Sequence, residues 1–148
     1  MPTESEWDKA ARGLDGSIYP WGVGFDGRKT NYCDAQCGAS WRDSVYDDGH
    51  SRTSNVGNFP AGASPFGLLD ASGNVREWAQ DFYDFRGYYR YPDSNPRGPE
   101  TGDGHVLRGG AWLDTANRVR PSARAFLPPD GRDNVTGFRC AADVSVFP

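Results

Sequence analysis

The sequence predicts an α+β fold with little regular secondary structure, formed by a single domain over residues 1–148. This length suffices for one domain and hardly for two. Only 36% of the residues are hydrophobic, yet 5 Trp, 7 Tyr and 8 Phe are present, and disordered chains are poor in aromatic residues. The 19 glycines and 11 prolines favour many turns and few long elements. We therefore expect large aromatic rings to fill the core.

The first expected element is a short helix after Thr3. Thr3 is a favourable N-cap, and Glu6 three residues later completes a capping box. Trp7, Ala10 and Ala11 share one helical face, and Gly13 is a suitable C-cap. These features predict roughly three turns of helix.

Residues 14–66 are rich in turn sequences such as LDGS, GFDG and DDGH. The next segment, 72–84, is interpreted as a second short helix. Val75, Trp78 and Phe82 recur in it at helical spacing, so we expect them to face inward.

Strands are expected in the C-terminal third, after a loop rich in Tyr, Pro and Gly over 85–104. Residues 105–112 have the pattern of a strand that a glycine pair interrupts, which favours a bulge or a close backbone approach. Residues 136–141 are the last strand-like segment, and residues 118–125 alternate only weakly.

The charge and hydropathy of the chain argue against two classes of partner. The 16 basic and 20 acidic residues give a net charge of −4. Because no basic run is present, nucleic acid is not an expected partner. No apolar stretch approaches the roughly 20 residues of a membrane span, so no membrane partner is expected. No signal peptide is evident before the first helix, and the cellular compartment stays open.

The cysteines leave two interpretations open. Cys33 and Cys37 stand four residues apart, while Cys140 is distant. The pair forms either a local disulfide, which would pin only this segment, or two free thiols. Metal binding by a C-x3-C pattern would need further ligands. His50 and His105 are the only histidines, which argues against a His-rich zinc or iron site.

Five sequence motifs occur in order along residues 2–142: PTESEWDKAARG, YPWG, SNVGNFPAGASPFGLLDASGNVREW, HVLRGGAW and NVTGFRCAAD. Each is weak alone, but the ordered set resembles the formylglycine-generating enzyme family, also called the sulfatase-modifying factor family. The resemblance implies a variant of the C-type lectin fold with little regular secondary structure. This agrees with the glycine-rich and aromatic-rich composition.

The chain departs from this family at the N-terminus, where the family's domain carries a longer stretch before the first helix. Here Met1 stands directly before Pro2. We expect either a truncated form or a missing half that another chain supplies. A strand edge left exposed in this way would be covered in a homodimer or by a partner chain.

A second departure concerns catalysis. Enzymes of the family oxidise a cysteine in a sulfatase peptide with a copper-binding cysteine pair, which lies shortly after the strand that matches HVLRGGAW. The corresponding residues 112–117 contain no cysteine, and Asp114 does not replace the thiolates that select Cu(I). Cys140 lies in a segment that is structural in the family. We therefore expect neither copper nor catalytic residues of this kind.

The segment LDASGNVREW matches a calcium-binding turn of the family. The resemblance implies carboxylate ligands from Asp70 and Glu77, main-chain carbonyls from Gly73 and Val75, and help from Asn74. Calcium takes six to eight hard oxygen ligands and tolerates irregular backbone. The alternative is that Asp70 caps the following turn, and that Glu77 is solvated or paired with an arginine.

A second calcium site of the family implies four ligand positions here. They are Asn31, the Tyr32 carbonyl, Asp48 and the His50 carbonyl, with Asp47 as a substitute carboxylate. The alternative is that the segment DDGH is only a tight turn. Calcium in a structural role is thus the expected cofactor.

Candidate binding residues come from the region that carries the active site in catalytic relatives. They are Trp112, Asp114, Asn117, Arg118, Arg120, Arg124 and Phe126. Tryptophan and arginine are enriched at binding hot spots, and arginine grips carboxylate or phosphate groups through paired hydrogen bonds. The alternative is that Arg108, Arg120 and Arg124 are buried and tie loops together through carbonyl groups.

Two kinds of function follow. The first is a non-catalytic, calcium-stabilised module that binds a protein or a small molecule. Variable proteins of diversity-generating retroelements and binding modules of bacterial signalling proteins share this skeleton. The second is a diverged oxidoreductase of the formylglycine-generating type that acts on a thiol, or a half-domain completed by another chain. The missing cysteine pair favours the first.

Overall fold

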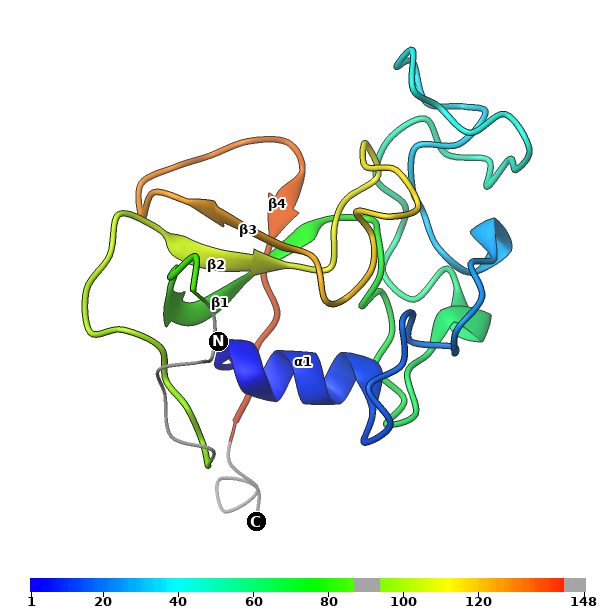
Figure 1. Cartoon of the computed structure of the whole chain (residues 1–148). Coiled ribbons are helices and arrows are strands. Elements are labelled where there is room, and N and C mark those ends of the chain that lie inside the picture. Colours follow the sequence, from blue (N-terminus) through cyan, green and yellow to red (C-terminus); the bar gives the residue numbers. More distant parts are fainter. Residues whose placement is uncertain (87–93, 143–148) are drawn as a thin grey trace.

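The computed structural model describes residues 1–86 and 94–142. Within these residues the regular elements are, in order, α1 (Glu4–Arg12), the 3-10 turns η1 (Gly27–Lys29) and η2 (Pro60–Gly62), β1 (Arg76–Phe82), β2 (His105–Arg108), β3 (Arg124–Leu127) and β4 (Thr136–Gly137). The remaining described backbone runs in turns and loops (Figure 1). The expected combination of helix and strand with little regular secondary structure is confirmed.

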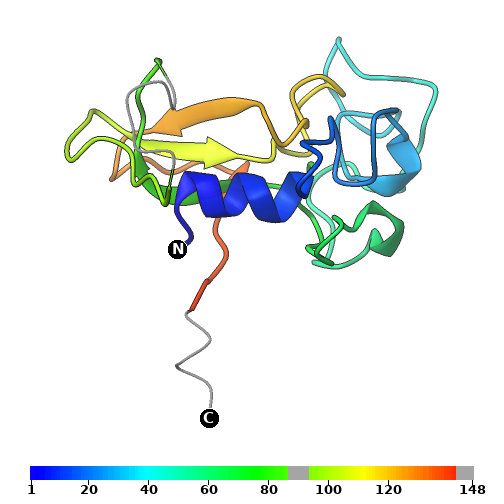
Figure 2. The same cartoon turned by 60° about the horizontal axis from the view of Figure 1, so that its bottom comes forward.

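The strands form one mixed sheet in the order β3-β2-β1-β4. β2 pairs antiparallel with both β1 and β3, whereas β4 runs parallel to β1. α1 packs against β1 and β2, and the loops of residues 14–75 gather beyond the C-terminal end of the helix (Figures 1 and 2). Loops and strand ends therefore carry the candidate site residues, and a small sheet holds them.

α1 forms where the sequence predicts it, because side chains of its own first turn cap it. Thr3 Oγ1 accepts a hydrogen bond from the Glu6 main-chain N–H at 3.3 Å, and Glu6 Oε2 accepts one from the Thr3 N–H at 2.8 Å. Gly13, at φ 70°, ends the helix. Trp7 and Ala11 are buried, whereas Ala10 is half-buried, so the expected inner face of the helix is confirmed for two of its three residues.

The second expected helix, at 72–84, is wrong, because this segment contains strand β1. Gly73 and Asn74 adopt φ angles of 81° and 61°, in the left-handed region that stops a right-handed helix. Val75, Trp78 and Phe82, which we expected to face inward, are only half-buried. Alternate side chains of the strand are buried instead, as the period of a strand requires. These are Glu77, Ala79 and Asp81.

Residues 105–112 form the expected strand up to their glycine pair. Gly109 and Gly110 follow β2 with φ angles of 89° and 69°. A Cβ atom on Gly110 would lie 2.6 Å from the Arg118 carbonyl oxygen. Here only glycine lets the two backbone segments approach so closely, as the interrupted strand predicts.

The other C-terminal expectations are met in part. The weakly alternating segment 118–125 contains the start of β3, and the strand-like segment 136–141 pairs only as the short β4. The described parts of the expected loop at 85–104 contain no helix or strand, and residues 87–93 lie outside the described residues. In the described part of the chain, no helix is long and apolar enough to cross a membrane.

Aromatic rings fill the core of the loop region, as the composition predicts. Tyr19 and Tyr32 are buried, and Trp21, Phe25 and Tyr46 pack against them. The ring centroids of Phe25 and Tyr32 lie 4.9 Å apart in an edge-on arrangement, and Tyr19 stacks on Trp21 at 5.3 Å. Such pairs add about 1 kcal/mol each to the free energy of burial. Packed aromatic rings thus stabilise a region that has almost no hydrogen-bonded strand pairing.

Cys33 and Cys37 form a disulfide, which decides between the two interpretations that their spacing leaves open. Both cysteines are buried, whereas Cys140 is free and exposed. The disulfide brackets Asp34 and follows Asn31 and Tyr32 directly in the sequence. It therefore fixes the backbone next to the second predicted calcium site.

Candidate functional site

The first predicted calcium turn is held by an ion pair within the chain. Glu77 is buried, and both of its carboxylate oxygens accept hydrogen bonds from the Arg139 guanidinium. Trp7 Nε1 donates to the same carboxylate at 2.7 Å. Arg139 thereby neutralises the charge of Glu77, which is the arginine pairing named above as an alternative.

Other residues of this turn hold the backbone of neighbouring loops. Asp70 Oδ2 accepts a hydrogen bond from the Gly57 N–H at 2.6 Å, so Asp70 ties a preceding loop rather than capping the following turn. Asn74 Oδ1 accepts one from the Ser54 N–H at 3.0 Å. Both side chains act as loop anchors in this arrangement.

Gly73 and Asn74 join the two predicted calcium sites. The Asn74 N–H donates to the Asn31 carbonyl oxygen at 2.8 Å. A Cβ atom on Gly73 would lie 2.1 Å from that oxygen, so a larger residue would push the two turns apart. Val75, the remaining predicted ligand, is half-buried at the entrance to β1.

The second predicted site contains two buried oxygen atoms without a well-formed hydrogen bond. They are Asn31 Oδ1 and Asp48 Oδ2. The Asn31 amide donates to the Arg52 carbonyl at 2.8 Å, which leaves its oxygen unpaired. Asp48 Oδ1 accepts from the His50 N–H at 2.8 Å, while its other oxygen is unpaired. Leaving a buried polar atom unpaired costs about 1–3 kcal/mol, so each of these two predicted ligand atoms calls for an explanation.

Within the described residues, the electrostatics of this second site also lack a compensating lysine or arginine. Burial raises the pKa of Asp48 to about 6; the His50 N–H opposes this shift and the charge of Asp34 adds to it. The main-chain N–H of Tyr32 also faces the Asp48 carboxylate. Among the described residues no lysine or arginine forms an ion pair with Asp34 or Asp48. Two acids therefore meet here beside main-chain and amide oxygens.

No group of three or more His, Cys, Asp or Glu side chains gathers to hold a metal ion within residues 1–86 and 94–142. A cation at the second site would therefore draw most of its ligands from main-chain and amide oxygens. Calcium accepts such ligands, whereas zinc and copper favour nitrogen and sulfur.

The candidate binding residues divide into structural and exposed ones. Trp112 is buried, and its Nε1 donates to the Asn134 carbonyl at 3.1 Å. Asp114 is buried too, and accepts hydrogen bonds of 2.8–3.1 Å from Nε and Nη2 of Arg76. These two side chains hold the segment after the glycine pair in place.

Arg124 and Arg108 also hold the fold. Arg124 binds the carboxylate of Glu4 at 2.5 and 2.8 Å and lies over the Tyr83 ring. Arg108 pairs with Glu4 and Asp8 of the same helix. Both arginines therefore tie α1 to the sheet, and they also donate to the Ala123 and Asp84 carbonyls. The alternative of buried arginines that tie loops together through carbonyl groups thus holds only in part, because Arg124 is half-buried and Arg120 is exposed.

The remaining candidates face solvent. Asn117, Arg118 and Arg120 are exposed, and Arg120 donates to the Asn117 carbonyl at 2.8 Å. Phe126 is exposed as well and stacks on Tyr83 with a centroid distance of 4.9 Å. The seven predicted residues thus do not form one continuous exposed face.

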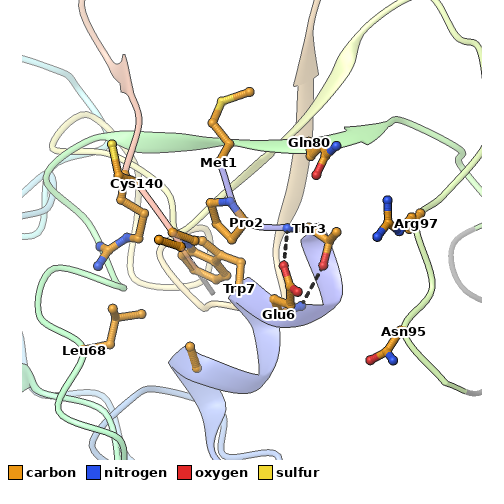
Figure 3. A pocket seen from close by; sticks show the side chains of 14 residues that line it. Met1, Pro2, Thr3, Glu6, Trp7, Leu68, Gln80, Asn95, Arg97 and Cys140 are labelled. Atoms are coloured by element: carbon orange, nitrogen blue, oxygen red, sulfur yellow. Dashed lines mark hydrogen bonds between the residues drawn. The ribbon is translucent and has the colours of Figure 1, made fainter. Parts of the chain in front are cut away.

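A further hollow lies beside the start of α1, where the sequence predicts no site. Its volume is about 710 Å³. Figure 3 shows Leu68 and Cys140 on one side of it and Asn95 and Arg97 on the other, with the first turn of α1 between them. No single sequence motif marks it, because its lining comes from both ends of the chain and from residues 68, 80, 95 and 97.

Trp41 is a further candidate residue that sequence reasoning misses. It lies in a polar turn segment, CGASWRDS, and it is 56% exposed. Its Nε1 donates to the Leu113 carbonyl at 3.1 Å, so it lies against the predicted binding region 72 residues away. A lone tryptophan in a polar turn is a signal for an exposed ring, but the sequence does not place it there.

A family model for the sulfatase-modifying factor enzyme 1-like domain matches residues 1–144. The chain belongs to this sulfatase-modifying factor family. The formylglycine-generating enzyme of Thermomonospora curvata is 38% identical over 97% of this chain and 49% of its own length. The "inactive C-alpha-formylglycine-generating enzyme 2" of Mus musculus is 36% identical, over 96% of this chain and 42% of its own.

A solved structure shows the same fold. Treponema denticola variable protein 1 superimposes with a TM-score of 0.72 at 29% identity, over 93% of this chain and 45% of that one. This chain of the sulfatase-modifying factor family therefore spans about half the length of each of these three proteins.

Proposed function

We propose that this chain is a non-catalytic, calcium-stabilised module that binds a ligand through the surface around residues 112–118. The observation that carries the calcium part is the pair of buried, unpaired oxygens, Asn31 Oδ1 and Asp48 Oδ2. A divalent cation supplies what both oxygens lack, and it offsets the repulsion between Asp48 and Asp34.

The residues of the second site fit calcium by their chemistry. The Asn31 amide oxygen, the Tyr32 and His50 carbonyls and the Asp48 carboxylate are all hard oxygen donors. Bound calcium would neutralise the buried acid and clamp residues 31–34 to residues 48–50. It would thus stabilise loops that contain almost no regular secondary structure.

The Asp70 turn is the weaker of the two proposed calcium sites. Its Gly73 and Val75 carbonyls and its two carboxylates are suitable donors. Arg139 already neutralises Glu77, however, so a calcium ion there would have to displace a guanidinium. We therefore assign the structural calcium to the Asn31 and Asp48 site first.

The absence of copper-type catalysis is supported by the chemistry at residues 112–117. Asp114 lies in this segment and is engaged by Arg76. Cys33 and Cys37 form a disulfide with each other, so of the three cysteines only Cys140 is free. A Cu(I) site built from two thiolates of this chain has no ligand pair. The names of two relatives, one an inactive enzyme and one a variable protein, are compatible with a binding role.

The test combines metal analysis of the purified protein with thermal melting curves. Purified protein should carry calcium in a ratio near one ion per chain, and its melting temperature should fall in EDTA and recover with added calcium. Protein that carries no calcium and melts identically with and without EDTA would remove the calcium part of the proposal.

An oxidoreductase that acts on a thiol is the main competing function. Incubation with copper and a cysteine-containing sulfatase-motif peptide, followed by mass spectrometry, tests it directly. Loss of the thiol with formation of an aldehyde would overturn the non-catalytic assignment.

A half-domain completed by another chain is a second candidate, because the chain spans about half the length of its relatives. Size-exclusion chromatography with light scattering tests this candidate. A clean monomer that melts cooperatively counts against it, and a homodimer favours it.

A further inference from the structure

A hollow of about 370 Å³ lies between the loop of Trp41 and the segment after the glycine pair. Its volume falls within the range of small-molecule sites in proteins. It is lined by Trp41, Arg76, Leu113, Asp114, Thr115 and Arg118. The lining joins three segments that are distant in the sequence, at Trp41, at Arg76 and at residues 113–118, so only the fold creates it.

Trp41 supplies an anchored aromatic surface to this hollow. Its only polar group is satisfied, because Nε1 donates to the Leu113 carbonyl. More than half of the side chain nevertheless stays exposed. A fixed and exposed indole ring loses little conformational entropy on binding, which is why tryptophan dominates binding hot spots. The ring is therefore ready to receive a planar apolar group.

Arg118 supplies the one uncompensated charge. Arg76 and Asp114 neutralise each other across 2.8 Å, which leaves the Arg118 guanidinium as the net charge of the lining. Within the described residues, the Arg118 side chain has no hydrogen bond or ion pair, while its main-chain N–H donates to the Thr115 carbonyl at 2.8 Å. Because the Arg118 backbone is fixed and its guanidinium has no partner among the described residues, this side chain is suited to bind an anion.

We propose that this hollow binds a ligand that carries one planar apolar group and one carboxylate. The ring packs on Trp41 and the carboxylate pairs with Arg118. This inference rests on the proposed binding function and names its ligand class. The same chemistry occurs in a free aromatic acid and in the C-terminal aromatic residue of a peptide.

Calorimetric titration of the calcium-loaded full chain tests the proposal with three probes. N-acetyl-L-phenylalanine carries both groups, its amide lacks the carboxylate, and N-acetylglycine lacks the ring. We expect the amide and the glycine derivative each to bind at least about tenfold more weakly than the acid, because each loses one contact of roughly 1.4 kcal/mol. Equal binding of the acid and the amide would overturn the proposal.

Substitutions locate the site on the surface. Arg118→Gln and Trp41→Leu should each weaken the binding of N-acetyl-L-phenylalanine by about tenfold or more. Arg132→Gln is the matched control, because Arg132 is exposed and outside the hollow. If both site variants keep the parent's affinity for N-acetyl-L-phenylalanine, and calcium still raises the melting temperature, this inference is wrong. The proposed calcium-stabilised module is then unaffected. A variant is scored only if its melting temperature matches the parent.

A tripeptide that ends in phenylalanine separates the two ligand sources. Binding tighter than that of the free acid identifies a peptide C-terminus, since additional peptide groups then contact the surface. Equal or weaker binding identifies a free aromatic acid. If neither the tripeptide nor the acid binds more tightly than the amide, the hollow does not recognise carboxylates.

Discussion

Arg139 holds Glu77 through both carboxylate oxygens, and so joins the segment after β4 to strand β1. The same guanidinium donates to the Leu69 carbonyl at 2.9 Å. One side chain thus closes the turn that carries Asp70, which lies next to Leu69. The buried carboxylate depends on this partner and on the Trp7 indole.

Arg139→Met should therefore destabilise the protein strongly. Removal of one partner leaves a buried carboxylate uncompensated, and such losses cost about 3–5 kcal/mol. Urea unfolding in EDTA measures the change, with Arg132→Met as an exposed control. If a saturating calcium concentration cancels most of this loss, calcium replaces the guanidinium and the Asp70 turn is a cation site. A loss below about 1 kcal/mol in EDTA contradicts the structural role.

Asp81 should make stability fall as the pH rises. Its Oδ2 accepts the Glu4 N–H at 2.7 Å, yet burial raises its pKa, and the Glu4 and Glu6 charges add to the shift. The folded state therefore keeps the proton to a higher pH than the unfolded chain, whose aspartates titrate near pH 4. Stability is full below that pH and declines as the pH rises through the folded-state pKa.

Urea unfolding between pH 4 and 7 measures how the free energy of unfolding depends on pH in the wild type and in Asp81→Asn, whose side chain does not titrate. We expect the wild-type free energy of unfolding to fall relative to the variant as the pH rises. Parallel curves for the two proteins would mean that the Asp81 carboxyl ionises in the folded state as it does in the unfolded chain.

Local signals account for the parts of the fold that the sequence predicts correctly. The cap of α1 depends on Thr3 and Glu6, only three residues apart, and the end of β2 depends on Gly109 and Gly110, which are adjacent. The 72–84 helix fails because Arg76–Phe82 pairs with β2 instead, and this pairing buries Glu77, Ala79 and Asp81 alternately. A short apolar pattern carries no information about such distant pairing.

The candidate site depends on contacts between distant residues, which a single sequence does not show. Trp41 reaches Leu113 over 72 residues, and Arg139 reaches Glu77 over 62. Asn31 and Asp48 were expected ligands through the resemblance alone. That each of them buries an oxygen without a partner follows only from the folded backbone.

The Cys33–Cys37 disulfide should stabilise the loops around the proposed calcium site. A bridge across so short a loop contributes about 2 kcal/mol through the entropy of the unfolded chain. The double variant Cys33→Ala, Cys37→Ala should lower the free energy of unfolding by about this amount and weaken calcium binding, because the bridge brackets Asp34. Cys140→Ala, which removes only an exposed thiol, is the control. Unchanged calcium affinity in the double variant would separate the disulfide from the cation site.

Asp48→Asn should abolish most of the stabilisation by calcium, whereas Asp47→Asn should preserve it. The two acids are adjacent, but Asp47 is exposed and binds the Gly49 N–H and the Gln36 amide, while Asp48 buries an unpaired oxygen. At a calcium concentration 100 times the dissociation constant, the parent gains about 2.7 kcal/mol, which corresponds to roughly 5–10 °C in melting temperature. Melting curves with calcium and with EDTA measure the shift in each protein. The reverse pattern, with the shift lost in Asp47→Asn and kept in Asp48→Asn, would move the ligand to Asp47, and a full shift in both variants would exclude this turn as the calcium site.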